Sequence, residues 1–67
     1  MDSAKLKYWV NKEGYTLGWL ADIVGINPAT LNRKMSGESD FTRSEIQIIK
    51  ANLKLSINEV EAIFFTE

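Results

Sequence analysis

The stretch Thr16–Gly37, TLGWLADIVGINPATLNRKMSG, combines two short helical patterns with one tight turn between them. Thr16 is a residue type that starts helices, because its hydroxyl accepts a hydrogen bond from a free backbone N–H group. The apolar residues that follow recur at i, i+3, i+4 and i+7, the spacing of one buried helix face. They are Leu17, Leu20, Ala21 and Val24. This pattern predicts a helix that starts after Thr16 and ends at Gly25.

The turn and the start of the next helix are equally well marked. Gly25 readily adopts the positive φ at which many helices end. Asn27 is a preferred N-cap, and Pro28 suits the first helical position because the N–H group that it lacks would be unpaired there. We expect this second helix over residues 27–36. The spacing is that of a helix-turn-helix unit over residues 16–37, although a plain helical hairpin has the same local signals.

Three further helices are expected outside this unit. The first runs from Ser3 to Glu13. Its apolar face comprises Leu6, Trp9 and Val10. The other two begin at capping boxes, in which a hydroxyl and a Glu three residues later each accept a backbone N–H. These boxes are Thr42-Arg43-Ser44-Glu45 and Ser56-Ile57-Asn58-Glu59. With no alternating strand pattern, repeat or linker, the sequence predicts one all-α domain over residues 1–67, a compact arrangement of five helices.

Composition narrows the chemistry available to the 67-residue chain. Hydrophobic residues make up 45% and charged residues 25%, which is typical of a folded globular protein. Cys and His are both absent, which excludes disulfides, thiolate nucleophiles and the usual zinc ligand sets. No apolar run is long enough to span a bilayer, and the start MDSAKLKYWV lacks an apolar signal segment. We therefore expect a cytoplasmic protein.

Catalysis is not expected. Without His or Cys, an enzyme would depend on carboxylates, lysines or hydroxyls, and the acids of this chain are scattered singly at caps and on polar faces. The glycine-rich motifs that hold phosphates, GxxxxGK[ST] and GxGxxG, do not occur. We predict a binding protein that needs no cofactor and no metal.

Several short segments of the predicted unit point to a known family. They are Leu20-Ala21, Val24-Gly25-Ile26, Thr30-Leu31 and Gly37. With these residues the stretch resembles the Cro and repressor family, the lambda-repressor-like or XRE-type helix-turn-helix proteins. Two later segments are similar to small repressor-like proteins encoded by phages and prophages of Gram-positive bacteria, namely Phe41-Thr42-Arg43-Ser44-Glu45-Ile46 and Ile63-Phe64-Phe65. The resemblance implies a lambda-repressor-like fold and a transcriptional regulator that binds double-stranded DNA in the nucleoid of a bacterial host.

The resemblance also implies which residues meet the bases. In the family, the second helix of the unit enters the major groove, and its first turn and next exposed turn touch base edges. The matching residues here are Asn27, Pro28, Ala29, Asn32 and Arg33. Arg33 can donate two hydrogen bonds to guanine, and Asn32 can pair with adenine. Pro28 or Ala29 can meet a thymine methyl group. The alternative is that Asn32 and Arg33 are plain surface residues.

Phosphate contacts in the family come from the start of the first helix of the unit and from the loop after the second. The residues here that can supply them are Thr16, Thr30, Lys34, Ser36, Thr42 and Arg43. Two departures weaken the expected affinity for phosphate. Leu17 stands where relatives commonly carry a phosphate-binding Gln, and the loop holds Glu38 and Asp40 where bases are common.

The charge balance favours a dimer. The net charge of −1 disfavours strong nonspecific binding to nucleic acid. All eight bases lie in residues 1–54, together with six acids, and few of these bases lie in or near the unit. One chain is therefore expected to bind a half-site weakly. Tight binding then requires a homodimer on a two-fold symmetric operator.

Apolar residues outside the expected core form a candidate partner or dimer surface. They are Trp19, Ile23, Ile63, Phe64 and Phe65. The last three are consecutive and cannot all face one core from one helix, so we expect at least one to be exposed. The alternative is internal packing. In that case Phe64 packs inward while Phe65 or Ile63 covers the first helix, and Trp19 and Ile23 pack on Trp9 and Tyr15.

A protein-interaction module is the competing hypothesis. An antirepressor or inhibitor with the same fold would bind a phage or host regulatory protein and would have lost DNA binding. The net acidity, Leu17 and the acidic loop favour this hypothesis, whereas Asn32-Arg33-Lys34 favours DNA contact. Salt dependence separates the two, because only a DNA-binding protein shows a steep loss of DNA affinity as salt rises.

Overall fold

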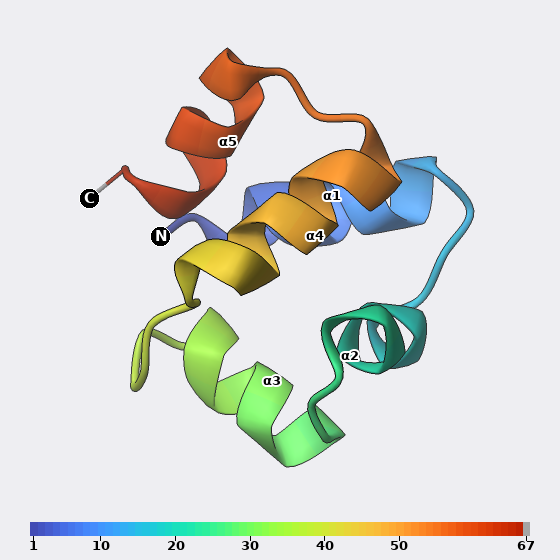
Figure 1. Ribbon diagram of the computed structural model, residues 1–67, viewed down its shortest axis with the longest axis vertical. Helices are drawn as coiled ribbons and strands as arrows, with labels where there is room; N and C mark the ends of the chain where they lie inside the picture. The colour runs from blue at the N-terminus through green and yellow to red at the C-terminus, as the bar shows by residue number, and fades with distance from the viewer. Residues whose placement is uncertain (67) are drawn as a thin grey trace.

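The computed structural model describes residues 1–66, and this part of the chain consists of five helices joined by short connections. The helices are α1 (Ser3–Lys12), α2 (Leu17–Val24), α3 (Pro28–Met35), α4 (Arg43–Leu53) and α5 (Ile57–Phe64). The predicted all-α, five-helix domain is thus confirmed, and the expected ends of α1 and α3 are correct to within one residue (Figure 1). None of the five helices reaches the length and continuous apolarity of a bilayer-spanning segment.

Side-chain caps explain where the helices begin. Thr16 accepts the N–H of Trp19 at 3.1 Å, and Asn27 accepts the N–H of Thr30 at 2.7 Å. Both predicted capping boxes are complete, one between Thr42 and Glu45 and the other between Ser56 and Glu59. The cap of α1 was not predicted: the Asp2 carboxylate accepts the N–H of Lys5 at 3.1 Å. All five helix starts therefore have at least one backbone donor satisfied locally.

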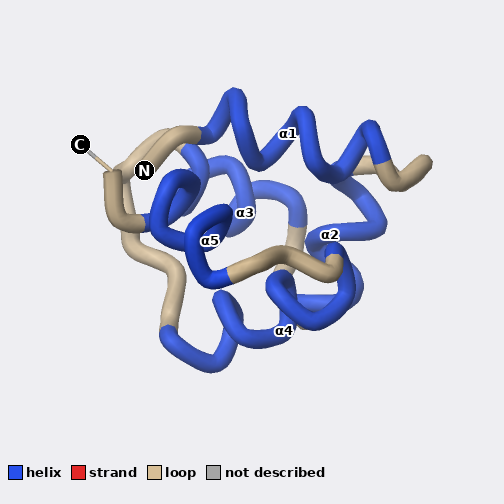
Figure 2. Tube along the Cα trace, turned by 90° about the horizontal axis from the view of Figure 1, so that it is seen from above, coloured by secondary structure: helices blue, strands red, loops and turns tan. Residues whose placement is uncertain are grey.

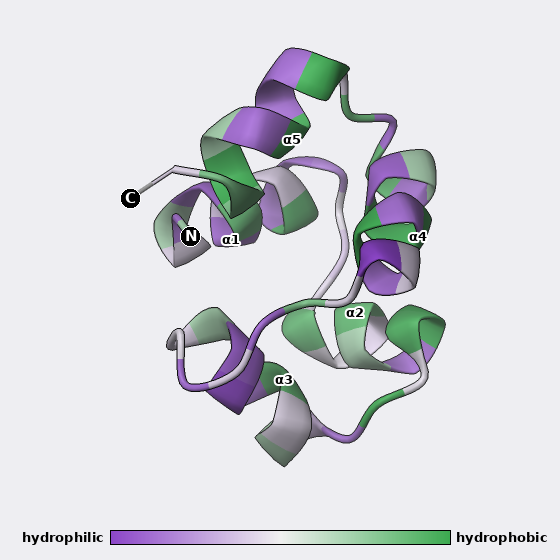
Figure 3. Ribbon diagram, turned by 60° about the vertical axis from the view of Figure 1, so that its left-hand side comes forward, coloured by the Kyte–Doolittle hydropathy of each residue, from purple (hydrophilic) through white to green (hydrophobic). Residues whose placement is uncertain are grey.

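The core draws on all five helices. Its largest fully buried side chains are Leu6, Val10, Leu20, Leu31, Ile49, Leu53 and Ile63. Along α4 and α5 hydrophobic and hydrophilic residues alternate, as expected for helices that bury one face (Figure 3). Leu55 is buried in the α4–α5 connection, whereas Ile46 and Phe64 are only half-buried. Met35, at the end of α3, is a core residue that the sequence patterns did not identify.

The helices pack so that α3 lies at one edge of the molecule. α2 packs against α1, α3 and α4, while α5 packs against α1 and α4. The start of the chain lies beside α5 (Figures 1 and 2), where the Asp2 N–H donates to the Ile63 carbonyl at 2.6 Å. α3 thus has α2 as its main helical neighbour, and its outer face is open to solvent.

The end of α4 differs from the ends of the first two helices. α2 ends at Gly25 with φ +80°, as predicted, and the chain turns after α1 at Gly14 with φ +83°. α4 instead ends at Lys54, whose φ of 55° and ψ of 45° are left-handed. A residue with a Cβ pays about 1 kcal/mol or more in this region, and glycine does not.

We expect Lys54→Gly to stabilise the protein by about 0.5–1 kcal/mol, because glycine relieves the left-handed strain at a modest entropic cost. Urea unfolding followed by far-UV circular dichroism measures this change. Lys54→Ala is the matched control, since it removes the same side chain and keeps the Cβ. A glycine variant no more stable than the alanine variant would contradict the prediction.

Candidate nucleic-acid interface

The predicted base-contacting residues lie together on the open face of α3. Asn27, Pro28, Ala29, Asn32 and Arg33 are all exposed. The opposite face of the helix is anchored in the core by Leu31 and Met35, which are 2% and 7% exposed. Positions 28, 29, 32 and 33 follow the i, i+1, i+4, i+5 spacing of a single helix face. These side chains therefore share one exposed face of α3.

Asn27 combines a capping role with remaining donor capacity. Its side-chain oxygen accepts the Thr30 N–H at 2.7 Å, which fixes the start of α3. The amide nitrogen keeps two N–H groups that can donate to an acceptor outside the protein. Pro28 and Ala29 follow as small apolar residues in the first turn. The start of α3 thus offers donors and an apolar surface side by side.

Arg33 is the exposed base of this face. The two ion pairs formed within residues 1–66 involve other residues, so its guanidinium is available to a ligand. Its backbone carbonyl accepts from the Ser36 hydroxyl at 3.0 Å and from the N–H groups of Glu38 and Ser39 at 2.9 and 3.3 Å. The loop after α3 is therefore folded back onto the backbone of the residue that carries this charge.

Lys34 lacks the free ammonium group that the predicted phosphate contact requires. Its ammonium donates to Glu45 Oε1 at 2.8 Å and to the Asp40 carbonyl at 3.0 Å. The two charged side chains are only 11% and 13% exposed. The lysine charge is therefore neutralised inside the protein. The sequence does carry a signal for this position: Lys34 follows Leu31 by three residues and so lies toward its buried face.

The Glu45 carboxylate is held in its charged form. Burial by itself raises its pKa. The hydrogen bond from Lys34, the hydrogen bonds with Thr42 and the charge of Lys34 outweigh this effect, so the pKa lies below its ordinary value of 4.5. The same carboxylate oxygen closes the capping box by accepting the Thr42 N–H at 2.7 Å. Glu45 thus caps the start of α4 and also binds the side chain of Lys34 near the end of α3.

The other predicted phosphate-contacting residues differ in exposure and in whether their donor groups are already used within the protein. The hydroxyls of Thr16 and Thr42 accept backbone N–H groups and keep their own protons for donation. The Ser36 hydroxyl already donates a hydrogen bond to the Arg33 carbonyl. Thr30 is half-buried, whereas Arg43 is exposed at the first position of α4. The available cations in and after α3 are therefore few, and the exposed acids Glu38 and Asp40 lie in the same loop.

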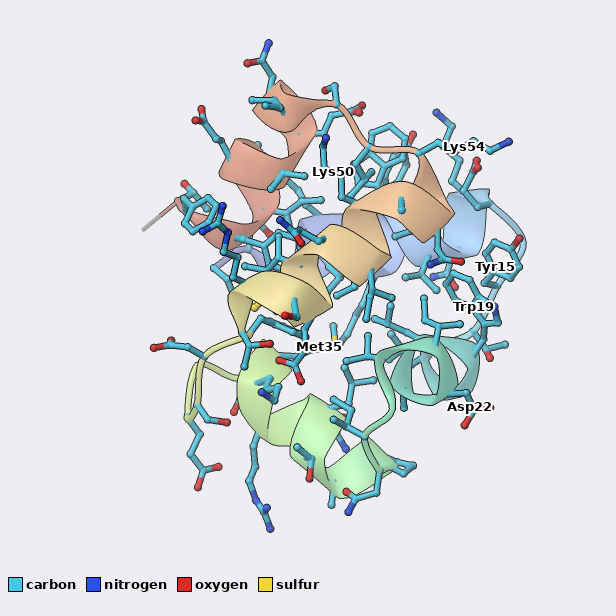
Figure 4. All side chains as sticks on the ribbon, in the orientation of Figure 1. Tyr15, Trp19, Asp22, Met35, Lys50 and Lys54 are labelled. Carbon is cyan, nitrogen blue, oxygen red and sulfur yellow. The ribbon has the colours of Figure 1, made fainter. Side chains whose placement is uncertain are left out.

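The predicted partner surface is only partly exposed. The prediction is wrong for Ile63, because this residue is fully buried in the core. Trp19 is half-buried and stacks on Tyr15 with ring centroids 3.7 Å apart (Figure 4), which is one of the contacts that the internal alternative names. Ile23 and Phe64 are half-buried, and Phe64 packs edge-to-face on Phe41 at 5.4 Å. Of the five predicted residues, Phe65 alone is largely exposed, at 67%.

Phe65 borders a hollow between α4 and α5. The hollow has a volume of about 310 Å³. Its lining residues are Ile46, Gln47, Lys50, Ile57, Val60, Glu61 and Phe65. Ile57 is 65% exposed, and the sequence patterns did not single it out. An apolar signal was present, since Ile57 is a large apolar residue within the first turn of a capped helix.

Comparison with known proteins leaves the family of the chain open. No family model, no curated protein and no solved structure matches it. Within residues 1–66, no group of three or more His, Cys, Asp or Glu side chains is placed to hold a metal ion.

Glu45→Gln is expected to destabilise the protein by about 1–2 kcal/mol at pH 7, because the partly buried Lys34 ammonium loses the carboxylate charge that neutralises it. A lowered folded-state pKa contributes stability that is fully present above 4.5 and is lost as pH falls through the folded value. The difference between wild type and variant should therefore shrink at pH 3, as measured by urea unfolding. Glu38→Gln, in the exposed loop, is the control. An equal difference at both pH values would rule out the ionic contribution.

Proposed function

We propose that the protein is a sequence-specific double-stranded DNA-binding transcriptional regulator of the Cro and repressor type. In this proposal α2 and α3 form the helix-turn-helix unit, and α3 enters the major groove. The observation that carries the proposal is the open face of α3, on which one exposed arginine and two exposed asparagines lie beside small apolar residues. α3 has eight residues and is about 12 Å long, which suits the major groove.

The chemistry of this face matches base edges. The Arg33 guanidinium can donate two parallel hydrogen bonds to guanine O6 and N7. The Asn32 amide can both donate to and accept from adenine. Pro28 and Ala29 lack a side chain that would obstruct close approach, and they can contact a thymine methyl group.

Few phosphate contacts accompany this face, which is why the proposal includes a homodimer. Lys34 is neutralised by Glu45, and Arg43 is the remaining exposed base near the loop after α3. Each lost phosphate contact lowers both the affinity and its salt dependence. Two copies reading two half-sites, about one helical turn of DNA apart, compensate for a weak half-site.

The hollow between α4 and α5 is the surface that we assign to the second copy. It is bordered by exposed apolar side chains, Ile57 and Phe65. It also carries one base and one acid, Lys50 and Glu61. In a two-fold contact the same patch faces itself, so the base of each copy can meet the acid of the other. The patch is therefore self-complementary in charge.

Selection from a random duplex pool at moderate salt is the primary test. We expect a two-fold symmetric site to emerge with the wild-type protein. Arg33→Ala should cost about 1–3 kcal/mol in binding and relax the preference at one base pair of each half-site, because its contacts are specific to guanine. Lys7→Ala, an exposed base on α1, is the control for the change in net charge.

Enrichment of no site would contradict the DNA proposal and favour the protein-interaction module. The exposed acids of the loop and the neutralised Lys34 are the observations that favour that alternative. Binding to mixed-sequence DNA that is independent of salt, or absent, would point the same way.

The dimer is tested separately by sedimentation equilibrium. We expect the wild-type mass to approach twice 7.6 kDa as concentration rises. Phe65→Ser should shift the equilibrium toward the monomer, because it removes an exposed apolar side chain from the proposed interface. Tyr8→Ser is the matched control, since Tyr8 is 57% exposed on α1. Equal self-association of wild type and Phe65→Ser would exclude the assigned surface.

A further inference from the structure

The support of α3 is uneven along its length. Its main helical neighbour is α2, and Leu31 and Met35 anchor it in the core. Asn27 caps its start. Its last turn has one further attachment, the Lys34 side chain, which crosses to the start of α4. This attachment adjoins Arg33, the exposed base of the open face.

Lys34 joins three parts of the backbone through one ammonium group. Glu45 Oε1 accepts both the Lys34 ammonium at 2.8 Å and the Thr42 N–H at 2.7 Å. The same ammonium donates to the Asp40 carbonyl at 3.0 Å. The end of α3, the loop that follows it and the N-cap of α4 are therefore linked by consecutive charge-assisted hydrogen bonds.

The low exposure of this link strengthens its effect. At 11% and 13% exposure, the two side chains are screened by water much less than a surface pair. Removing one partner leaves the other charge partly buried and unpaired, which is costly. By contrast, the ion pair between Lys5 and Asp2 is long, at 3.9 Å, and exposed. Lys34 with Glu45 is therefore the pair with the geometry to hold one helix against another.

We propose that Lys34 and Glu45 are positioning residues for the open face of α3. They fix the last turn of α3 and the loop at 36–42 relative to α4, and so set the direction in which Arg33 projects. Lys34 makes no phosphate contact of its own. This inference depends on the proposed function, because it assigns a specificity role to residues behind the DNA-binding face. Base readout requires side chains to be held within a fraction of an ångström, and such a link supplies that constraint.

The first experiment compares binding of the full chain to a selected duplex and to a scrambled duplex. Lys34→Met and Glu45→Gln should each weaken binding to the selected duplex roughly tenfold. Binding to the scrambled duplex and its salt slope should change little. Glu45→Gln keeps the capping box, because Gln serves at that position as well as Glu, so folding is retained. Arg43→Met is the matched control and should lower the salt slope on both duplexes by roughly 0.9.

The second experiment needs no DNA. Amide hydrogen exchange should become faster at Glu38 and Ser39, whose N–H groups bond to the Arg33 carbonyl, in both variants. At Leu20 and Ile49 in the core, the free energy of opening should fall only by as much as the global free energy of unfolding falls in each variant. This measurement separates local release of the loop from general destabilisation.

Two results would overturn the inference. An equal loss on both duplexes for Lys34→Met, with a salt slope lowered by roughly 0.9, would make Lys34 a phosphate contact instead. Unchanged exchange at Glu38 and Ser39 in both variants would show that the pair does not hold the loop. If the wild-type protein binds neither duplex, the proposed function fails, and the exchange measurement still decides whether the pair positions α3.

Discussion

The five helices have only 8 to 11 residues each, and helices of that length are marginal in water by themselves. Each one persists because it contributes an apolar face to a single shared core. The most deeply buried side chains come from every helix, and the chain has no disulfide to replace them. The dependence is mutual, so the orientation of each helix is set by its neighbours rather than by its own sequence. The open face of α3 exists only because Leu31 and Met35 on its other side are held in this core.

The position of α3 at the edge of the bundle creates both an opportunity and a constraint. A helix with one main helical neighbour can present a whole face to a ligand, but it is also the helix that packing restrains least. Local backbone bonds and one ionic link compensate for this. The loop after α3 folds back onto the Arg33 carbonyl, and Lys34 connects the same turn to the N-cap of α4. The charge of Lys34, which the sequence assigns to a phosphate contact, instead stabilises the protein internally through Glu45.

Local signals predicted most of the fold. Four helix caps and one left-handed glycine were predicted correctly, because each depends on a few adjacent residues. The caps are Thr16, Asn27, Thr42 and Ser56, and the glycine is Gly25. The residue set on α3 was assigned from the resemblance to the Cro and repressor family, and its exposure agrees with the 3.6-residue period that separates it from Leu31. The partner surface was predicted less well. Ile63, Phe64 and Phe65 are equivalent in apolar character, and their burial ranges from complete to slight according to what packs beside them.

The sequence alone determined the helices, their starts and the polar face of α3, because these follow from hydrogen bonds and periodicity within a few residues. The tertiary structure alone decided the pairing of Lys34 with Glu45, the burial of Ile63 and the exposure of Ile57. Each of these depends on residues that are distant in the chain and are brought together by packing. Lys34 and Glu45 are eleven positions apart on different helices, and no local pattern encodes the angle at which those helices meet. Whether a charge faces a ligand or the interior is decided by that angle.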